Sequence, residues 1–156
     1  MMIPSCLVFI TLAFVSQANL AQSPAAAADC LSDLDKRRLA AEAGIEKRIK
    51  ICREISDRLH KAVEQAAKKQ QAAEVASLLT CWGDHLDASL RDVESFINRK
   101  KRSGALKDFE IQLRKAIRDM EDARLKAPYE ESAHYEAWID QAKKVHDRFV
   151  DFLFQR

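Results

Sequence analysis

Residues that form turns are scarce in this sequence. Its 156 residues include only three glycines and three prolines, the residue types that usually bound strands and shape tight turns. The scarcity argues against a β-rich fold and leaves no glycine-rich loop for phosphate. No nucleophile-elbow motif is present either. We therefore expect an all-α protein, predict no catalytic residues, and expect that it is not an enzyme.

Charge is missing from the start of the chain. The first 28 residues contain no Lys, Arg, Asp or Glu, and residues 6–15 form an apolar run, CLVFITLAFV. A run of this length is typical of a signal peptide and is too short to span a bilayer. Small residues at positions 16 and 18 suit cleavage after Ala18, and cleavage after Ala21 is the alternative.

These features predict the fate of the N-terminal part of the chain. We expect residues 1–18 to be a signal peptide and residues 19–31, which include the segment QSPAAAAD, to be a flexible lead-in. The mature protein is then exported, to the periplasm or the extracellular space, and is not an integral membrane protein.

The rest of the chain carries all 26 basic and 24 acidic residues, and the net charge is only +2. This balance does not favour nucleic acid as a partner. Apolar residues recur there at steps of three and four, which indicates amphipathic helices packed side by side. We predict one domain over residues 32–156, an elongated antiparallel bundle of two helical hairpins. Its four helices are expected at about 33–66, 70–102, 105–127 and 130–155.

The turn between the first two helices has no Gly, Pro, Asn or Asp. One continuous helix to residue 102 would be roughly 105 Å long, and two cysteines favour a hairpin instead. Cys52 and Cys81 would face each other if the chain reversed near Ala66. In an oxidising compartment a disulfide between them would stabilise the turn by roughly 3–4 kcal/mol. We therefore predict a hairpin held by a Cys52–Cys81 disulfide.

The stretch LLTCWGDHLDASL, residues 78–90, is the best candidate for metal or redox chemistry. Cys81 and His85 are four residues apart and would share a helix face. In the predicted register, however, His85 faces Arg48, which opposes a cation. We expect Trp82 to lie in the core and Gly83 to let the first two helices approach closely.

A carboxylate three residues before a histidine occurs at Asp57–His60 and at Glu131–His134. Ferritin-like bundles bind two metal ions through such units together with further inward-facing glutamates. No glutamate lies on the predicted core stripes, so we predict no metal ligands and no cofactor.

Three features suggest contacts with other molecules. Four consecutive cations, Arg99, Lys100, Lys101 and Arg102, form a possible surface contact, although basic residues at a helix C-terminus also complement the helix dipole. The C-terminal segment FVDFLF, residues 149–154, places Phe149 and Phe152 in the core and Phe154 at its edge. Cys30, left over by the predicted pairing, suggests a disulfide-linked homodimer.

The most direct functional interpretation is an exported, non-catalytic helical bundle that interacts with a protein or with the cell envelope. Its partner would be contacted through charged helix faces or the C-terminal aromatic segment. The alternative is a bundle that binds a small ligand or a metal ion between its helices.

Overall fold

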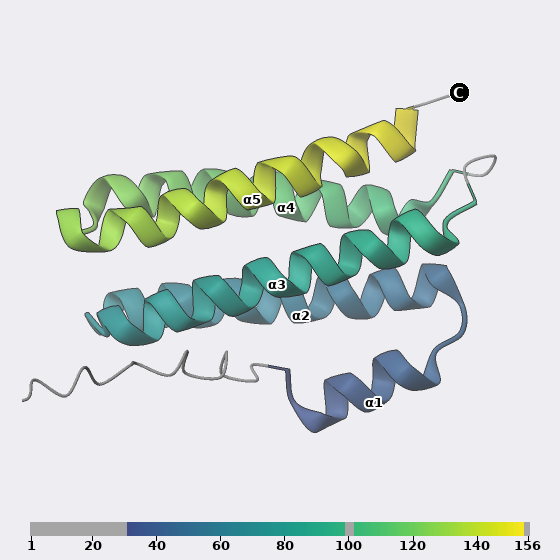
Figure 1. The fold of residues 1–156 in the computed structure, drawn as a ribbon, viewed down its shortest axis with the longest axis horizontal. Coiled ribbons are helices and arrows are strands. Elements are labelled where there is room, and N and C mark those ends of the chain that lie inside the picture. Colours follow the sequence, from purple (N-terminus) through teal and green to yellow (C-terminus); the bar gives the residue numbers. More distant parts are fainter. Residues whose placement is uncertain (1–30, 99–101, 155–156) are drawn as a thin grey trace, which may run out of the picture.

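The computed structural model describes residues 31–98 and 102–154, and every regular element in these ranges is a helix (Figure 1). The helices are α1 (Asp33–Ala41), α2 (Ile45–Lys68), α3 (Ala72–Phe96), α4 (Gly104–Lys126) and α5 (Tyr129–Phe154). The all-α prediction is confirmed. Over the described residues there are five helices rather than the expected four.

The additional helix arises because the first predicted helix, 33–66, is divided at Gly44. This glycine is the N-cap of α2 and has an extended backbone, with φ −86° and ψ 119°. The guanidinium of Arg48 donates to the backbone carbonyls of Leu39 and Glu42, at the C-terminal end of α1. A side chain from α2 therefore stabilises the break, and the periodicity of apolar residues does not report such a contact.

The short helix α1 is held against α2 by a buried carboxylate. Ser32 and Asp35 form a capping box at the start of α1, as their spacing in the sequence predicts. Asp35 also accepts hydrogen bonds of 3.1 and 2.5 Å from the guanidinium of Arg58 on α2. These bonds hold the pKa of Asp35 at about 2, below its ordinary value of 3.8.

The chain reverses between α2 and α3 through a C-terminal cap. Gln70 has a positive φ of 57°, a conformation more usual for glycine. The N–H of Gln71 donates to the carbonyl of Ala66, and the N–H of Gln70 donates to that of Ala67, both at 3.0 Å. This pair of bonds is the Schellman motif. The first two predicted helices are thus a hairpin and not one long rod, but the turn lies about three residues later than predicted.

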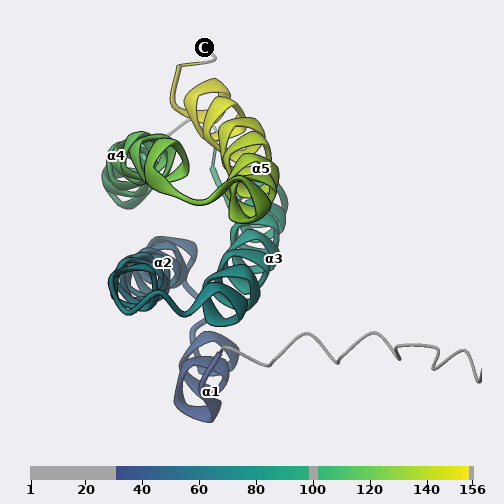
Figure 2. The same ribbon diagram turned by 90° about the vertical axis from the view of Figure 1, so that its left-hand side faces the viewer.

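Two hairpins lie side by side, one formed by α2 and α3 and the other by α4 and α5 (Figures 1 and 2). Helix α2 packs beside α4, and α3 packs beside α5, so the four long helices form two layers. Within each layer the two helices run in the same direction. Helix α1 packs on α2 at one edge of the bundle.

Large apolar side chains from all four long helices fill the space between the layers. The largest fully buried ones include Trp82, Trp138, Tyr135, Phe109 and Phe149. The aromatic ring of Trp82 lies 4.1 Å from that of Trp138, centroid to centroid, which joins α3 to α5. Trp82 is therefore a core residue, as predicted. In the C-terminal segment Phe149 and Phe152 are buried, and Phe154 is 75% exposed, also as predicted.

The predicted Cys52–Cys81 disulfide is wrong. Cys52 is a free, buried thiol, and the disulfide to which Cys81 belongs does not involve Cys52. The reason is the later turn. The side chain of Trp82 donates to Ser56 at 2.8 Å, and this register places Cys52 roughly 7 Å along the helix axis from the level of Cys81.

Several predictions concern residues outside the described ranges. The signal peptide, residues 1–18, lies there, as does most of the lead-in, 19–31, including Cys30. Leu31, at the end of the lead-in, packs against the core. Among the described helices, none has a stretch both long enough and apolar enough to cross a bilayer.

Candidate functional site: a groove and a histidine cluster between α2 and α4

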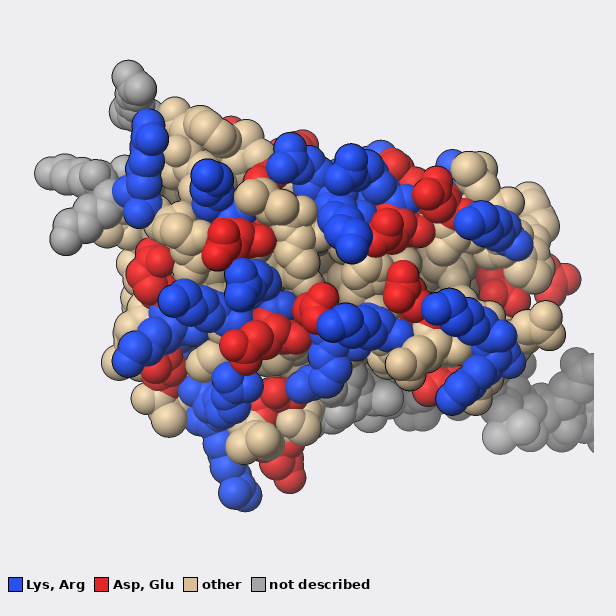
Figure 3. All heavy atoms as spheres, turned by 180° about the vertical axis from the view of Figure 1, so that it is seen from behind, with Lys and Arg blue, Asp and Glu red and all other residues tan. Residues whose placement is uncertain are grey.

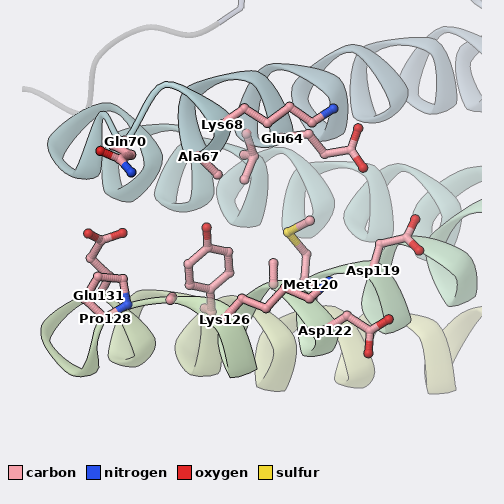
Figure 4. A pocket seen from close by; sticks show the side chains of 14 residues that line it. Glu64, Ala67, Lys68, Gln70, Asp119, Met120, Asp122, Lys126, Pro128 and Glu131 are labelled. Carbon is pink, nitrogen blue, oxygen red and sulfur yellow. The ribbon is translucent and has the colours of Figure 1, made fainter.

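A groove of about 730 Å³ opens between the C-terminal half of α2 and the turn from α4 to α5 (Figure 4). Three buried apolar side chains line it, namely Val63, Met120 and Tyr135. Its charged lining residues come from three helices: Glu64, Lys68, Asp119, Asp122, Lys126 and Glu131. The groove thus combines apolar surface with charges of both signs.

The spacing of the charged residues explains why they reach the same groove. Glu64 and Lys68 are four residues apart on α2, and Asp122 and Lys126 are four apart on α4, so each pair shares a helix face. Within the described part of the chain, neither lysine forms an ion pair with a carboxylate. Both ammonium groups are therefore available to a ligand.

His60 lies beside this groove, between two of its carboxylates. Its Nε2 atom is 3.7 Å from a carboxylate oxygen of Glu64, on the same helix, and 3.5 Å from one of Asp119, on α4. One ligand atom from each of these three residues lies within 4.8 Å of the other two. His60 is buried, whereas Glu64 and Asp119 are partly exposed at the groove. We call these three residues the His60 cluster.

The imidazole of His60 is held in place by the aromatic core. Its ring stacks on Trp82 with centroids 5.3 Å apart and an interplanar angle of 24°. Trp82 is in turn fixed by its hydrogen bond to Ser56 and by its contact with Trp138. The Nε2 atom of His60 is itself buried, and no hydrogen-bond partner satisfies it within the described structure.

Sequence reasoning singled out His60 but paired it with the wrong carboxylate. Asp57, three residues earlier, instead binds Lys61 at 2.6 Å. The partners that the structure brings to His60 are Glu64, whose i, i+4 spacing was visible in the sequence, and Asp119, 59 positions away. No sequence pattern signals the second contact, because it depends on how α4 packs against α2.

Two further predictions concern the second acid–histidine unit, Glu131–His134, and the absence of glutamate from the core-facing side of the helices. His134 is exposed, so Glu131–His134 forms no buried site. Glu110 on α4 is buried, with 8% of its surface exposed, contrary to the prediction that no glutamate faces the core. It is 2.9 Å from Nε2 of His146 on α5. A buried carboxylate is thus present, but a histidine partners it.

In the stretch at residues 78–90, the histidine that suggested metal chemistry has a partner within the fold. His85 is buried, and its Nε2 lies 2.8 Å from the backbone carbonyl of Cys52. Burial lowers the pKa of His85, which favours the neutral imidazole. The prediction that His85 faces Arg48 is wrong, because Arg48 pairs with Asp92 at 2.7 Å.

Gly83 does permit a close approach, but to a different helix from the one predicted. A Cβ atom at this position would collide with the side-chain amide of Gln141 on α5. That amide donates to Asp87 at 2.7 Å. The glycine therefore serves the contact of α3 with α5 rather than that of α2 with α3.

The basic run at 99–102 is only partly described. Arg102 is exposed and lies just before the N-cap of α4, and Arg99, Lys100 and Lys101 lie outside the described residues. On the face that α2 and α4 present, basic and acidic side chains are interspersed (Figure 3). This face does not show the single-sign surface that a polyanion would require.

No known protein family, curated protein or solved structure matches this chain.

Proposed function

We propose that this protein is an exported, non-catalytic binding protein that holds a small, amphipathic ligand in the groove between α2 and α4. The observation that supports this proposal is the groove itself, in which buried apolar side chains lie beneath charged ones of both signs. Ligand sites typically combine an apolar lining with a few polar groups that orient the ligand. Export and the lack of catalysis are proposed from the sequence.

The lining residues suggest how such a ligand would be held. Its apolar part would contact Val63, Met120 and Tyr135, and the ammonium groups of Lys68 and Lys126 would bind polar substituents. The three apolar side chains are buried in the core, so we expect the groove to be largely formed before the ligand binds.

The experiment is a titration of the full chain with Nile red, a neutral dye whose fluorescence increases in apolar surroundings. Ala67 lines the groove and is solvent-exposed, so Ala67→Trp should fill the groove and weaken dye binding at least about tenfold. Ala137→Trp is the matched control, because Ala137 is an exposed helical alanine outside the groove lining. Equal dye binding by the parent and Ala67→Trp, or no saturable binding, would contradict the proposal.

A second candidate function, contact with a protein, is favoured by two exposed aromatic side chains. Phe96 and Phe154 are 65% and 75% exposed and end α3 and α5 at the same end of the bundle (Figure 1). Exposed aromatic residues are enriched at protein interfaces. If that protein is a second copy of this chain, sedimentation equilibrium should show a dimer. Phe154→Ser should then disrupt the dimer. Tyr129→Ser, at the opposite end, is the control.

A further inference from the structure

We infer that His60, Glu64 and Asp119 form a binding site for one divalent transition-metal ion of the Zn²⁺ type. This inference does not depend on the small ligand proposed for the groove. It concerns the His60 cluster beside the groove and follows from a different observation. That observation is a buried imidazole nitrogen facing two carboxylates without a hydrogen bond.

The distances suit coordination better than direct hydrogen bonding. Zn²⁺ binds nitrogen and oxygen ligands at about 2.1 Å, so two ligands of a tetrahedral ion are about 3.4 Å apart. The Nε2 atom of His60 is 3.5 Å from Asp119 and 3.7 Å from Glu64. These separations are longer than good hydrogen bonds, but they match the edges of a coordination tetrahedron.

The polar environment of the three residues also suits a divalent cation. The two buried carboxylates in the described part of this protein have close partners: Asp35 binds Arg58 at 2.5 Å, and Glu110 lies 2.9 Å from His146. By contrast, over the described ranges no lysine or arginine forms an ion pair with Glu64 or Asp119. A divalent cation would neutralise both carboxylates and satisfy Nε2 of His60.

The ligand set selects the class of metal. Imidazole nitrogen suits Zn²⁺ and the neighbouring transition metals, whereas Ca²⁺ and Mg²⁺ prefer sites made of oxygen ligands. Three protein ligands leave a fourth position of a tetrahedral ion open. Because Glu64 and Asp119 also line the groove, that position would be accessible to a small molecule bound there.

The test is calorimetric titration of the full chain, freed of metal by a chelator, with Zn²⁺ alone. We expect one equivalent to bind, and we expect Mg²⁺ not to compete. Asp119→Asn should weaken Zn²⁺ binding at least about tenfold, because even the loss of a residue that only supports a metal ligand costs roughly 10–100-fold. Asp122→Asn is the matched control, because Asp122 lies on the same helix and in the same groove but outside the His60 cluster. It should bind Zn²⁺ within about twofold of the parent.

Tryptophan fluorescence tests whether the ion binds at His60. Because His60 stacks on Trp82, Co²⁺ at Nε2 should quench tryptophan fluorescence and saturate at one equivalent in the parent and in Asp122→Asn. In Asp119→Asn the quenching should require at least tenfold more Co²⁺.

Two results would overturn the inference: Zn²⁺ binding to Asp119→Asn as tight as to the parent, or no stoichiometric binding to the parent. Unfolding curves of the metal-free variants show whether each is folded, and Asp119 is partly exposed, so its substitution should be tolerated. Failure here would leave the groove proposal standing, because the dye titration of Ala67→Trp uses no metal. Conversely, Zn²⁺ binding without dye binding would contradict only the groove.

Discussion

His60 and His85 lie on the facing helices of one hairpin, and both are buried, with 7% and 4% of their surfaces exposed. Both are close to Trp82: His60 stacks on its ring, and His85 follows it by three residues on α3. Their polar contacts differ. His85 is paired with the carbonyl of Cys52 at 2.8 Å, whereas Nε2 of His60 faces two carboxylates without a hydrogen bond.

The comparison distinguishes a histidine that is satisfied within the fold from one that is available to the proposed metal ion. A buried polar group usually has its partner within the fold, and each exception calls for an explanation. His85 follows the rule and can be understood as part of the core. Of the two histidines, His60 is the exception, and its unsatisfied Nε2 atom is next to the groove that Glu64 and Asp119 line.

Replacing Trp82, the residue on which His60 stacks, should have the largest effect. Trp82→Ala removes a fully buried indole and should lower the free energy of unfolding by about 3–5 kcal/mol. Trp82→Phe keeps most of the apolar volume but leaves Ser56 without its indole donor, so about 1–2 kcal/mol should be lost. Urea unfolding followed by circular dichroism measures both. A loss below about 1 kcal/mol for Trp82→Ala would contradict the central position of the indole.

Asp35 shows what a fully partnered buried charge contributes. Its pKa is about 2 in the fold and 3.8 otherwise, because Arg58 and Ser32 both donate to the carboxylate, so these contacts together stabilise the protein above pH 3.8 by about 2 kcal/mol. This contribution disappears as the pH falls from 3.8 toward 2. Asp35→Asn should therefore have a lower free energy of unfolding than the parent at neutral pH. Its free energy of unfolding should also fall less than that of the parent as the pH is lowered toward 2. Urea midpoints at neutral pH and near pH 3 test this, with exposed Asp33→Asn as the control.

Substituting leucine for each histidine tests the comparison most directly. In metal-free protein, His85→Leu removes a satisfied hydrogen bond and should cost about 1–2 kcal/mol. His60→Leu removes a buried nitrogen that makes no hydrogen bond among the described residues, so the free energy of unfolding should change by less than about 1 kcal/mol. The two variants are compared by urea unfolding in the presence of a chelator. A larger loss in the free energy of unfolding for His60→Leu than for His85→Leu would contradict the proposed difference between the two histidines.

The pH dependence near neutrality should come in part from His85. Burial lowers the pKa of His85 below its ordinary value of 6.5, so at mildly acidic pH the unfolded chain binds a proton that the folded protein does not. Stability should therefore fall as the pH is lowered through about 6.5. His85→Leu should show a smaller fall than the parent between about pH 7.5 and 5.5. Identical pH profiles would contradict the burial of a neutral His85.

The cysteines offer a test that does not depend on stability. Burial raises the pKa of the Cys52 thiol, so it should react slowly with iodoacetamide in the native protein and rapidly after denaturation. Cys81 should react only after reduction, because it is in a disulfide. Peptide mapping by mass spectrometry locates the label. A Cys52→Ala variant should leave the protection of Cys81 unchanged.

The fold class and much of the core could be predicted because apolar periodicity records which face of each helix is buried. Trp82, Phe149 and Phe152 were all identified in this way. The position of the α2–α3 turn could not be predicted, because Gln70 adopts a backbone conformation that the sequence would normally signal with glycine. The error shifted the register and produced both the wrong disulfide and the wrong neighbour for His85.

By itself, then, the sequence determined that the chain forms amphipathic helices and which side chains they bury, since both follow from local spacing. Only the tertiary structure decided which faces meet. A helix can slide by one turn against its neighbour and still bury the same stripe, so register depends on caps and long-range contacts. For that reason Asp119, on α4, joins His60 and Glu64, on α2, only in the folded protein.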